Sequence, residues 1–280
     1  MLVNSIKMLQ NAKNGKYAVP QFNINNLEWA KYILEECENN KIPVILGVSE
    51  GAAKYMGGYT VVTELVKSLI KELGITIDVC LHLDHGSSFD TCKKAIDSGF
   101  TSVMIDASKY EIDENIRITK KVVDYAHSKG VSVEAEVGHI GGDEDGVSNN
   151  IYHATLEDCV KLFNETNIDS IAPALGSVHG LYKGLPDLNF ERMALINENL
   201  KVPLVLHGGT GIPNEDIKKA IKCGISKINI NTELQIAWHD AVVRFIKENE
   251  AVYDPRKVIS SGQAAMKEAI VNKINLFFNR

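Results

Sequence analysis

One short segment constrains the fold of this chain most, because an apolar strand pattern ends there in an acid, a histidine and a glycine. The segment reads Ile77-Asp78-Val79-Cys80-Leu81-His82-Leu83-Asp84-His85-Gly86. In an extended chain, Cys80, His82 and Asp84 share one face. His179 and His207 also end apolar runs, and each of these histidines is followed by glycine. Three imidazoles at strand ends are typical of a metal site with three protein ligands and an open position.

Strand-like and helix-like segments alternate along nearly the whole chain. We expect strands at residues 17–24, 43–49, 77–86, 102–108, 132–138, 170–177, 202–207 and 226–231. We expect helices at residues 26–37, 61–73, 89–97, 114–127, 156–164, 190–197, 214–223 and 233–247. Apolar strands in such units are typical of parallel sheets that are buried on both faces, and they predict an α/β fold, the (β/α)8 or TIM barrel. The alternative is an open doubly wound sheet, but its usual GxGxxG turn is missing.

Composition fits a single barrel. Of the 280 residues 45% are hydrophobic, and no Pro/Gly/Ser linker divides them, so we expect one domain over residues 1–280. Residues 250–280 lie beyond the eight units and include an expected helix at 262–278. This C-terminal helical extension must pack on the barrel or on a neighbouring subunit.

Net charge and cysteine content limit the kinds of partner and the cellular compartment that we expect for this protein. The net charge of −6 argues against nucleic acid, and no apolar stretch is long enough for a membrane span or shaped like a signal peptide. The five cysteines are scattered and lack CxxC spacing, as expected of reduced thiols in a cytoplasmic protein.

All strands of such a barrel deliver their carboxyl-terminal residues to one face, where active sites are built. The residues expected there are Asn23, Ser49, Asp84, His85, Asp106, Glu136, His179, His207, Asn229 and Asn231. Polar side chains at every strand end predict a pocket rather than ordinary surface. Glu134 and Glu136 alternate with apolar residues, so at least one carboxylate should point inward, where a metal or a metal-bound histidine would pair with it.

Two glycine-rich runs suggest further parts of a site. Gly208-Gly209-Thr210-Gly211 follows the seventh expected strand, where barrels often hold a phosphate on backbone N–H groups and a helix N-terminus. Asn229, Asn231 and Thr232 would complete this cup, and Lys183 could add a cation. The alternative interpretation is an ordinary tight turn. The run at residues 141–146 is acidic and hinged by glycines, so it is either a solvated turn or a mobile flap that carries Glu144 as a proton-transfer group.

A metal with three histidines, a nearby aspartate, a phosphate cup and a mobile glutamate fit proton removal next to a carbonyl. Along nearly its whole length the sequence resembles class II, metal-dependent fructose-bisphosphate aldolases of the shorter-chain, class IIB-like subgroup. The segments that carry the resemblance are YAVPQFN at 17–23, LHLDHGSS at 81–88, ALGSVHG at 174–180, HGGTGIP at 207–213 and KININTE at 227–233.

The resemblance implies a role for each matching residue. His85, His179 and His207 would bind a catalytic Zn²⁺, and Asp106 with Glu136 would form an alternative position for it or a second divalent-metal position. Asp84 would exchange the proton on the hydroxyl of the cleaved bond, and Glu144 the proton at the enediolate carbon. The dihydroxyacetone-phosphate half would bind to the residues Gly180, Gly208, Gly209, Thr210, Asn229, Ile230, Asn231 and Thr232, supported by a monovalent cation, Na⁺ or K⁺. Arg256 would reach the other phosphate from the partner subunit of a homodimer or homotetramer.

Two questions stay open at this stage. Asn231 stands where tagatose-bisphosphate aldolases usually have a small residue, so fructose 1,6-bisphosphate is the expected substrate and tagatose 1,6-bisphosphate the alternative. A catalytically silent barrel that only binds a sugar phosphate is the second alternative, although Asp84 and all three histidines are present.

Overall fold

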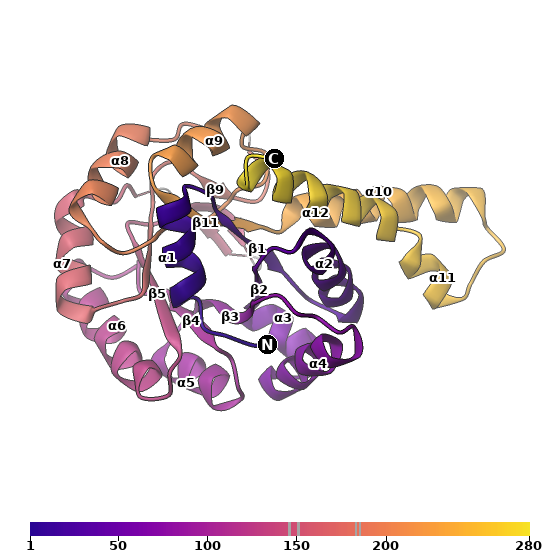
Figure 1. Cartoon of the computed structure of the whole chain (residues 1–280), viewed down its shortest axis with the longest axis horizontal. Coiled ribbons are helices and arrows are strands. Elements are labelled where there is room, and N and C mark those ends of the chain that lie inside the picture. The colour runs from indigo at the N-terminus through magenta and orange to yellow at the C-terminus, as the bar shows by residue number, and fades with distance from the viewer. Residues whose placement is uncertain (145–146, 150–151, 183, 185) are drawn as a thin grey trace.

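The structure is a computed structural model of the chain, and it describes all residues except 145, 146, 150, 151, 183 and 185, with no side chains described for 142–144 and 147–149. Eight parallel strands close into a barrel in the order β1-β11-β10-β8-β5-β4-β3-β2 (Figure 1). Their bounds are β1 Val19–Asn23, β2 Val44–Ser49, β3 Val79–Gly86, β4 Ser102–Ile105, β5 Ser132–Val137, β8 Ser170–Pro173, β10 Leu204–Leu206 and β11 Ile225–Ile230. The predicted (β/α)8 barrel is therefore confirmed.

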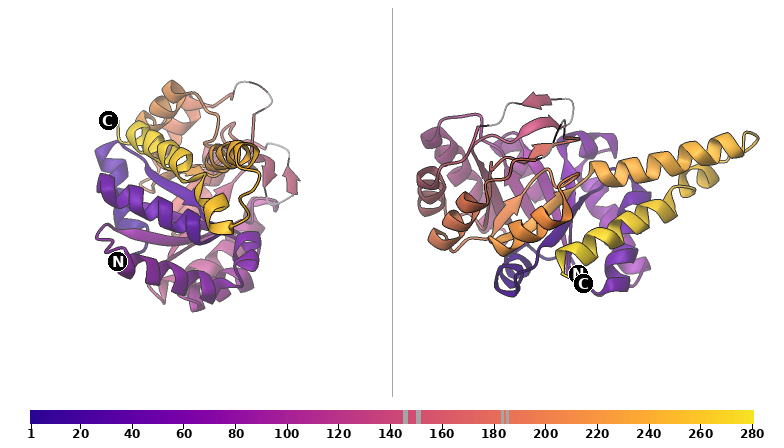
Figure 2. Two further views of the ribbon diagram at one scale, coloured as in Figure 1. Left: turned by 90° about the vertical axis from the view of Figure 1, so that its right-hand side faces the viewer. Right: turned by 90° about the horizontal axis from the view of Figure 1, so that it is seen from above.

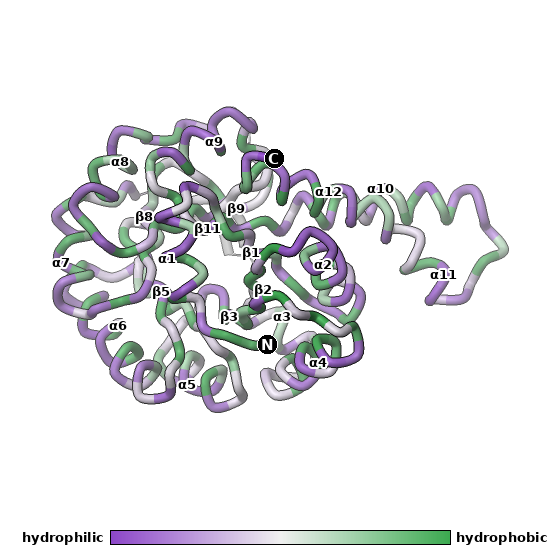
Figure 3. Tube along the Cα trace, in the orientation of Figure 1, coloured by the Kyte–Doolittle hydropathy of each residue, from purple (hydrophilic) through white to green (hydrophobic). Residues whose placement is uncertain are grey.

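Helices form a ring around this barrel. They are α2 Leu27–Asn40, α3 Glu50–Tyr55, α4 Tyr59–Glu72, α5 Phe89–Asp97, α6 Ile112–His127, α7 Leu156–Thr166, α8 Phe190–Asn199, α9 Asn214–Lys222 and α10 Thr232–Glu248. Along the ring the trace alternates between hydrophobic and hydrophilic residues, as expected of helices with one face on the sheet (Figure 3). Asn26 and Ser88 begin α2 and α5 with side-chain caps that accept from Trp29 N and Thr91 N.

The amino-terminal end of the barrel is closed by α1 (Ile6–Gly15), which the sequence pattern did not reveal. Met8 and Leu9 of this helix pack on the buried residues Val19, Ile45 and Cys80, which begin the barrel interior. At the other end, a small sheet orders β7 (Val147–Asn149), β6 (Gly141–Glu144) and β9 (Val178–His179) side by side. The expected flap segment thus includes a short hairpin.

The middle of the barrel interior is polar. Gln21, His82, Ser102, Glu134, Ser170 and Lys227 are all almost completely buried. His82 is the register partner of Ser102, and its Nδ1 lies 2.8 Å from the Ser102 hydroxyl. Polar groups this deep are stable only when they pair with one another, and this layer forms the floor of the site described below.

The C-terminal part of the chain leaves the barrel as an arm. The far half of α10, α11 (Pro255–Ser260) and the start of α12 (Gln263–Phe277) project well beyond the ring (Figures 1 and 2). The rest of α12 returns and packs against α2, α9 and α10. Among the described residues, no helix combines the length and apolarity that crossing a membrane requires.

Candidate active site

Three histidines from three separate strand ends meet at the carboxyl-terminal rim of the barrel. His85 is the penultimate residue of β3, His179 ends β9 and His207 follows β10. One ring nitrogen from each lies within 4.8 Å of the others, close enough for one metal ion. The ring centroids are 4.7 to 5.7 Å apart. Burial, followed by the neighbouring imidazoles, holds the pKa of His179 well below its usual value, which favours the neutral form that binds metals.

His85 reaches this group because the end of β3 is irregular. In a regular strand His85 would face away from Asp84, since successive side chains alternate. The pairing of β3 with β4 shifts register between Leu83 and Gly86, and His85 has a φ of 51°, in the left-handed region. Such bulges re-aim a side chain, and the strained backbone is maintained where function requires it. Adjacent residues can therefore both face the site.

The outer nitrogens of two imidazoles are anchored by carboxylates. His85 Nδ1 lies 3.0 Å from Asp106 Oδ2, and His207 Nε2 lies 2.9 Å from Glu134 Oε1. If each anchored nitrogen carries the proton, the nitrogens that face each other, His85 Nε2 and His207 Nδ1, both present lone pairs at 2.9 Å. A shared cation relieves that repulsion, so the donor set fits a metal ion.

A second group combines His85 with Asp106 and Glu136, whose ligand atoms also lie within 4.8 Å of one another. Glu136 Oε1 accepts from Ile140 N at 3.0 Å, whereas the buried Oε2 has no hydrogen-bond partner among the described residues. Burial and the neighbouring Asp106 hold the pKa of Glu136 well above its usual value. A buried carboxylate oxygen without a donor fits a cation ligand as well.

Asp84 is buried beside the histidines but is held by amides. Its Oδ2 accepts from Asn23 Nδ2 at 2.8 Å and its Oδ1 from Asn229 Nδ2 at 3.4 Å. Burial alone would raise the pKa of Asp84, but His85 and His207 lower it below its ordinary value. Asp84 is therefore a buried carboxylate that is ionised at neutral pH.

The site opens into a cavity of about 190 Å³. Its lining includes Asn23, Asp84, His179, Gly180, Gly208, Thr210, Asn229, Asn231, Thr232 and Gln235. Thr232 begins α10, so a helix N-terminus faces the cavity, which suits an anionic group. Gly208 has a φ of +65°, and a Cβ there would lie 2.1 Å from Val178 O. Only glycine permits this close approach of the two loops.

Tyr182, which the sequence analysis did not single out, joins the same loops. Its hydroxyl accepts from Val178 N at 3.1 Å and donates to Gly208 O at 3.0 Å. Burial raises its pKa to about 12, so it stays a donor at neutral pH. A lone tyrosine in a polar loop gives no sequence signal for such a role.

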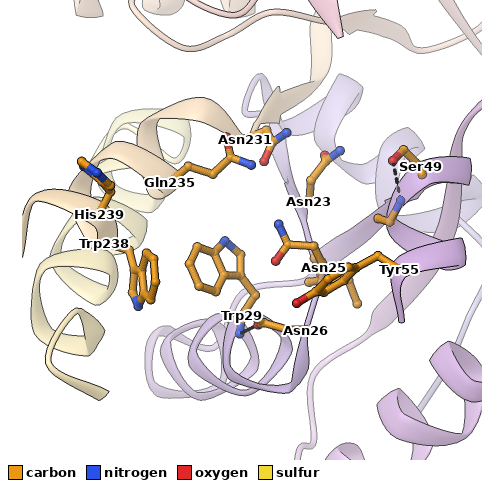
Figure 4. A pocket seen from close by; sticks show the side chains of 13 residues that line it. Asn23, Asn25, Asn26, Trp29, Ser49, Tyr55, Asn231, Gln235, Trp238 and His239 are labelled. Carbon is orange, nitrogen blue, oxygen red and sulfur yellow. Dashed lines mark hydrogen bonds between the residues drawn. The ribbon is translucent and has the colours of Figure 1, made fainter. Parts of the chain in front are cut away.

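A larger pocket of about 480 Å³ adjoins the cavity, and Asn23, Asn231 and Gln235 line both (Figure 4). Ser49 also lines it, but its hydroxyl caps α3 by accepting from Ala52 N at 3.1 Å. Trp29 faces the same pocket, and its Nε1 has no hydrogen-bond partner among the described residues. The described lining residues include neither lysine nor arginine, so the pocket offers polar groups without a strong cation.

Some predicted residues lie elsewhere. Ile230 is buried in the hydrophobic core, so only its backbone is available to the site, and Gly209 N donates to Asn229 O. Lys183 lies outside the described residues, and of Glu144 only the backbone, in β6, is described. Arg256 lies on the arm, where its exposed guanidinium pairs with Asp254.

A closed barrel with three imidazoles and a buried carboxylate at its carboxyl-terminal rim is the arrangement of a metal-dependent barrel enzyme. Residues 3–280 match the family model for fructose-bisphosphate aldolase class-II. The chain belongs to this family of lyases, as the sequence motifs indicated. Membership implies a divalent metal, typically zinc, and sugar phosphate substrates.

Relatives that match along nearly the whole chain support the same family assignment. A fructose-bisphosphate aldolase of Geobacillus stearothermophilus is 56% identical over 277 residues, which cover 99% of this chain and 96% of that protein. One from Staphylococcus aureus is 54% identical, with 99% and 97% covered. The crystal structure of the YdjI aldolase from Escherichia coli K12 has a TM-score of 0.87 and 34% identity, with 99% and 97% covered.

Proposed function

We propose that this protein cleaves fructose 1,6-bisphosphate reversibly into dihydroxyacetone phosphate and glyceraldehyde 3-phosphate. The observation that carries the proposal is the convergence of His85, His179 and His207 beside the buried carboxylate of Asp84, at a cavity that a helix N-terminus faces. The close relatives named fructose-bisphosphate aldolase support the same activity. We also propose that residues 1–280 form a single domain and that the protein is cytoplasmic.

His85, His179 and His207 would hold a catalytic zinc ion, and His85 with Asp106 and Glu136 would hold a second divalent ion or an alternative position of the first. When bound, the metal supplies positive charge that stabilises the negative charge developing on the substrate oxygens. The anchored outer nitrogens of His85 and His207 support this assignment, because metal-binding imidazoles usually donate their other N–H to a carboxylate.

Proton transfer would be divided between two carboxylates. Asp84, fixed by Asn23 and Asn229, would take the proton from the C4 hydroxyl as the C3–C4 bond breaks, and return it in the condensation direction. Glu144, carried by the hairpin of β6 and β7, would exchange the proton at C3 of the dihydroxyacetone-phosphate half. Closure of this hairpin would also exclude water from the reacting carbons.

The two phosphates would bind in different ways. The dihydroxyacetone phosphate group would sit in the cup of Gly180, Gly208, Thr210 and the start of α10, with backbone N–H groups as donors and a Na⁺ or K⁺ ion in support. The second phosphate would occupy the larger pocket near Asn23 and Ser49. Because no lysine or arginine is among the described residues that line this pocket, its cation must come from elsewhere.

Arg256 of a partner subunit would supply that cation. Within its own chain Arg256 belongs to α11, which lies on the arm beyond the ring of helices (Figure 1). A symmetric dimer, alone or within a tetramer, can place each arm against the other barrel. In this arrangement the arm would contribute to the site of the partner subunit, which would explain why it projects from its own barrel.

The test is a coupled cleavage assay on fructose and tagatose 1,6-bisphosphates before and after dialysis against a chelator. We expect cleavage of the fructose epimer to dominate, to disappear with the metal and to return with Zn²⁺. Preference for the tagatose epimer would reassign the substrate, and binding of either epimer without any cleavage would support the silent barrel. Full activity in protein shown to be free of metal would refute the proposed mechanism.

A further inference from the structure

A buried chain of contacts runs from His207 into the barrel floor. His207 Nε2 faces Glu134 Oε1 at 2.9 Å, and Glu134 Oε2 accepts from Lys227 Nζ at 2.7 Å. The side chains of all three residues are only 1% exposed. Ser170 adds a further donor, because its hydroxyl lies 3.3 Å from the same Glu134 Oε2. The roles proposed above use neither Lys227 nor Ser170, and they use Glu134 only as the carboxylate beside His207 Nε2.

The contacts around His207 specify one tautomer. Glu134 is paired with an ammonium group, so it is an acceptor, and the Nε2 that faces it must carry the proton. Asn229 Nδ2 lies 3.3 Å from His207 Nδ1 and 3.4 Å from Nε2, so it does not distinguish the two nitrogens. With the proton on Nε2, Nδ1 keeps its lone pair, and this is the nitrogen that faces His85 across 2.9 Å.

We propose that Lys227 and Glu134 are positioning residues, which hold His207 in the tautomer and orientation with which it binds the metal through Nδ1. The inference rests on the three-histidine metal site of the proposed function and names residues outside it. Lys227 is needed because its ammonium binds Glu134 Oε2 at 2.7 Å, which holds the carboxylate in the orientation that presents Oε1 to His207 Nε2. The ion pair keeps Glu134 an acceptor without exposing either charge to water.

The pair of buried charges has an alternative explanation, in which it only stabilises the barrel. Metal affinity separates the two explanations, because a purely structural pair would change unfolding of the metal-free protein and leave metal binding to the folded protein unchanged. Exchange of a partner that orients a ligand typically costs about 10–100-fold in metal affinity.

The experiment measures Zn²⁺ and Co²⁺ dissociation constants by competition with a chromophoric chelator. It compares wild type with Glu134→Gln, Lys227→Met and the double variant. We expect each single change to weaken both metals by about 10–100-fold and to alter the visible spectrum of the Co²⁺ protein. We expect the double variant to lose less than the sum of the two, because the contacts act as one unit. Thermal unfolding of the metal-free proteins identifies variants that are folded.

A matched pair of milder variants keeps the test decisive if a buried-charge variant does not fold. Ser170→Ala removes the hydroxyl beside Glu134, whereas Ser102→Ala removes an equally buried hydroxyl that contacts His82 instead. We expect Ser170→Ala to weaken metal binding and Ser102→Ala to leave it unchanged. Equal losses in these two variants, or wild-type affinity and Co²⁺ spectrum in folded Glu134→Gln, would overturn the inference. Since the readout is metal binding, a missing cleavage activity would be detected separately.

Discussion

At the scale of single residues, the site depends on neighbours with different tasks. Asp84 and His85 are adjacent in sequence, but amides hold the first and the histidine group contains the second. A strand of regular alternation would bring only one of them to the cavity. The shift in register at the end of β3 and the left-handed backbone of His85 allow both, so the carboxylate and the imidazole lie side by side at the site.

The substitution Asp84→Asn tests whether Asp84 serves in proton transfer while the neighbouring His85 serves in metal binding. The amide keeps the size of the side chain but cannot act as a base, so we expect turnover to fall by about 10²–10⁴-fold. Metal content and substrate KM should change little, because Asp84 is not assigned as a ligand. Metal analysis and steady-state kinetics of the purified variant check both statements. Loss of metal together with activity would show that Asp84 is a ligand and that the assigned roles are wrong.

Asn231 belongs to the same scale, since it lines both the cavity and the larger pocket. Fructose and tagatose bisphosphates differ at C4, and an amide that hydrogen-bonds this region penalises the wrong epimer by leaving a buried polar group unpaired. We expect Asn231→Ala to lower the fructose-to-tagatose ratio of kcat/KM by about tenfold or more. An unchanged ratio would assign the discrimination to another residue, and Gln235, which lines both pockets, would be the next variant.

At the scale of elements, Glu38 ties the end of α2 to the segment before β3. Its carboxylate accepts from Thr76 N at 2.7 Å and Ile77 N at 3.1 Å, and it pairs with Lys41. Lys41 first, and then Thr76 and Ile77, lower its pKa to about 2 against the opposing effect of burial. The folded state therefore binds this proton more weakly than the unfolded chain does.

The sign of the pH dependence follows from that depressed pKa. The stabilisation from Glu38 is fully present above the unfolded value of about 4.3 and is lost as pH falls towards 2. We expect Glu38→Gln to lower the Tm at about pH 7, and the gap to wild type to narrow by about pH 3.5. The control is Glu64→Gln, since the pair of Glu64 with Lys67 is exposed to solvent. A gap that stays constant across this pH range would contradict the assignment.

The sequence predicted most elements because their local signals agree. The expected helix 89–97 matches α5, where the Ser88 cap and the apolar periodicity coincide. Other features carry no local signal. The β3 bulge depends on pairing with β4, and α1 closes the barrel only through tertiary contacts. The alternation around Glu134 predicted an inward carboxylate, but nothing local predicted Lys227 as its partner, because only barrel closure brings the two together across 93 positions.

At the scale of the whole molecule, the arm predicts that two chains share each site. Arg256→Ala alone should lower kcat/KM for the bisphosphate by about 10–100-fold, the value of a charge-assisted hydrogen bond. Co-expression of Asp84→Asn with Arg256→Ala chains should restore activity. In a hybrid dimer, the barrel of the Arg256→Ala chain meets the arm of the Asp84→Asn chain, so one of the two sites is intact. The control pairs Asp84→Asn with the double variant Asp84→Asn/Arg256→Ala, which leaves no intact site. A hybrid no more active than its parents would place Arg256 outside catalysis.

An arm that completes the partner subunit's site also makes the affinity for substrate depend on the concentration of the protein. Dilution that separates the chains would remove the cation from the larger pocket, so KM for the bisphosphate would rise as the protein becomes scarce. The coupling is reciprocal, and substrate that bridges a barrel and the neighbouring arm must strengthen their association by the same factor. The sugar bisphosphate would then hold the two subunits of its own enzyme together, and the fraction of assembled dimer would rise with the concentration of substrate.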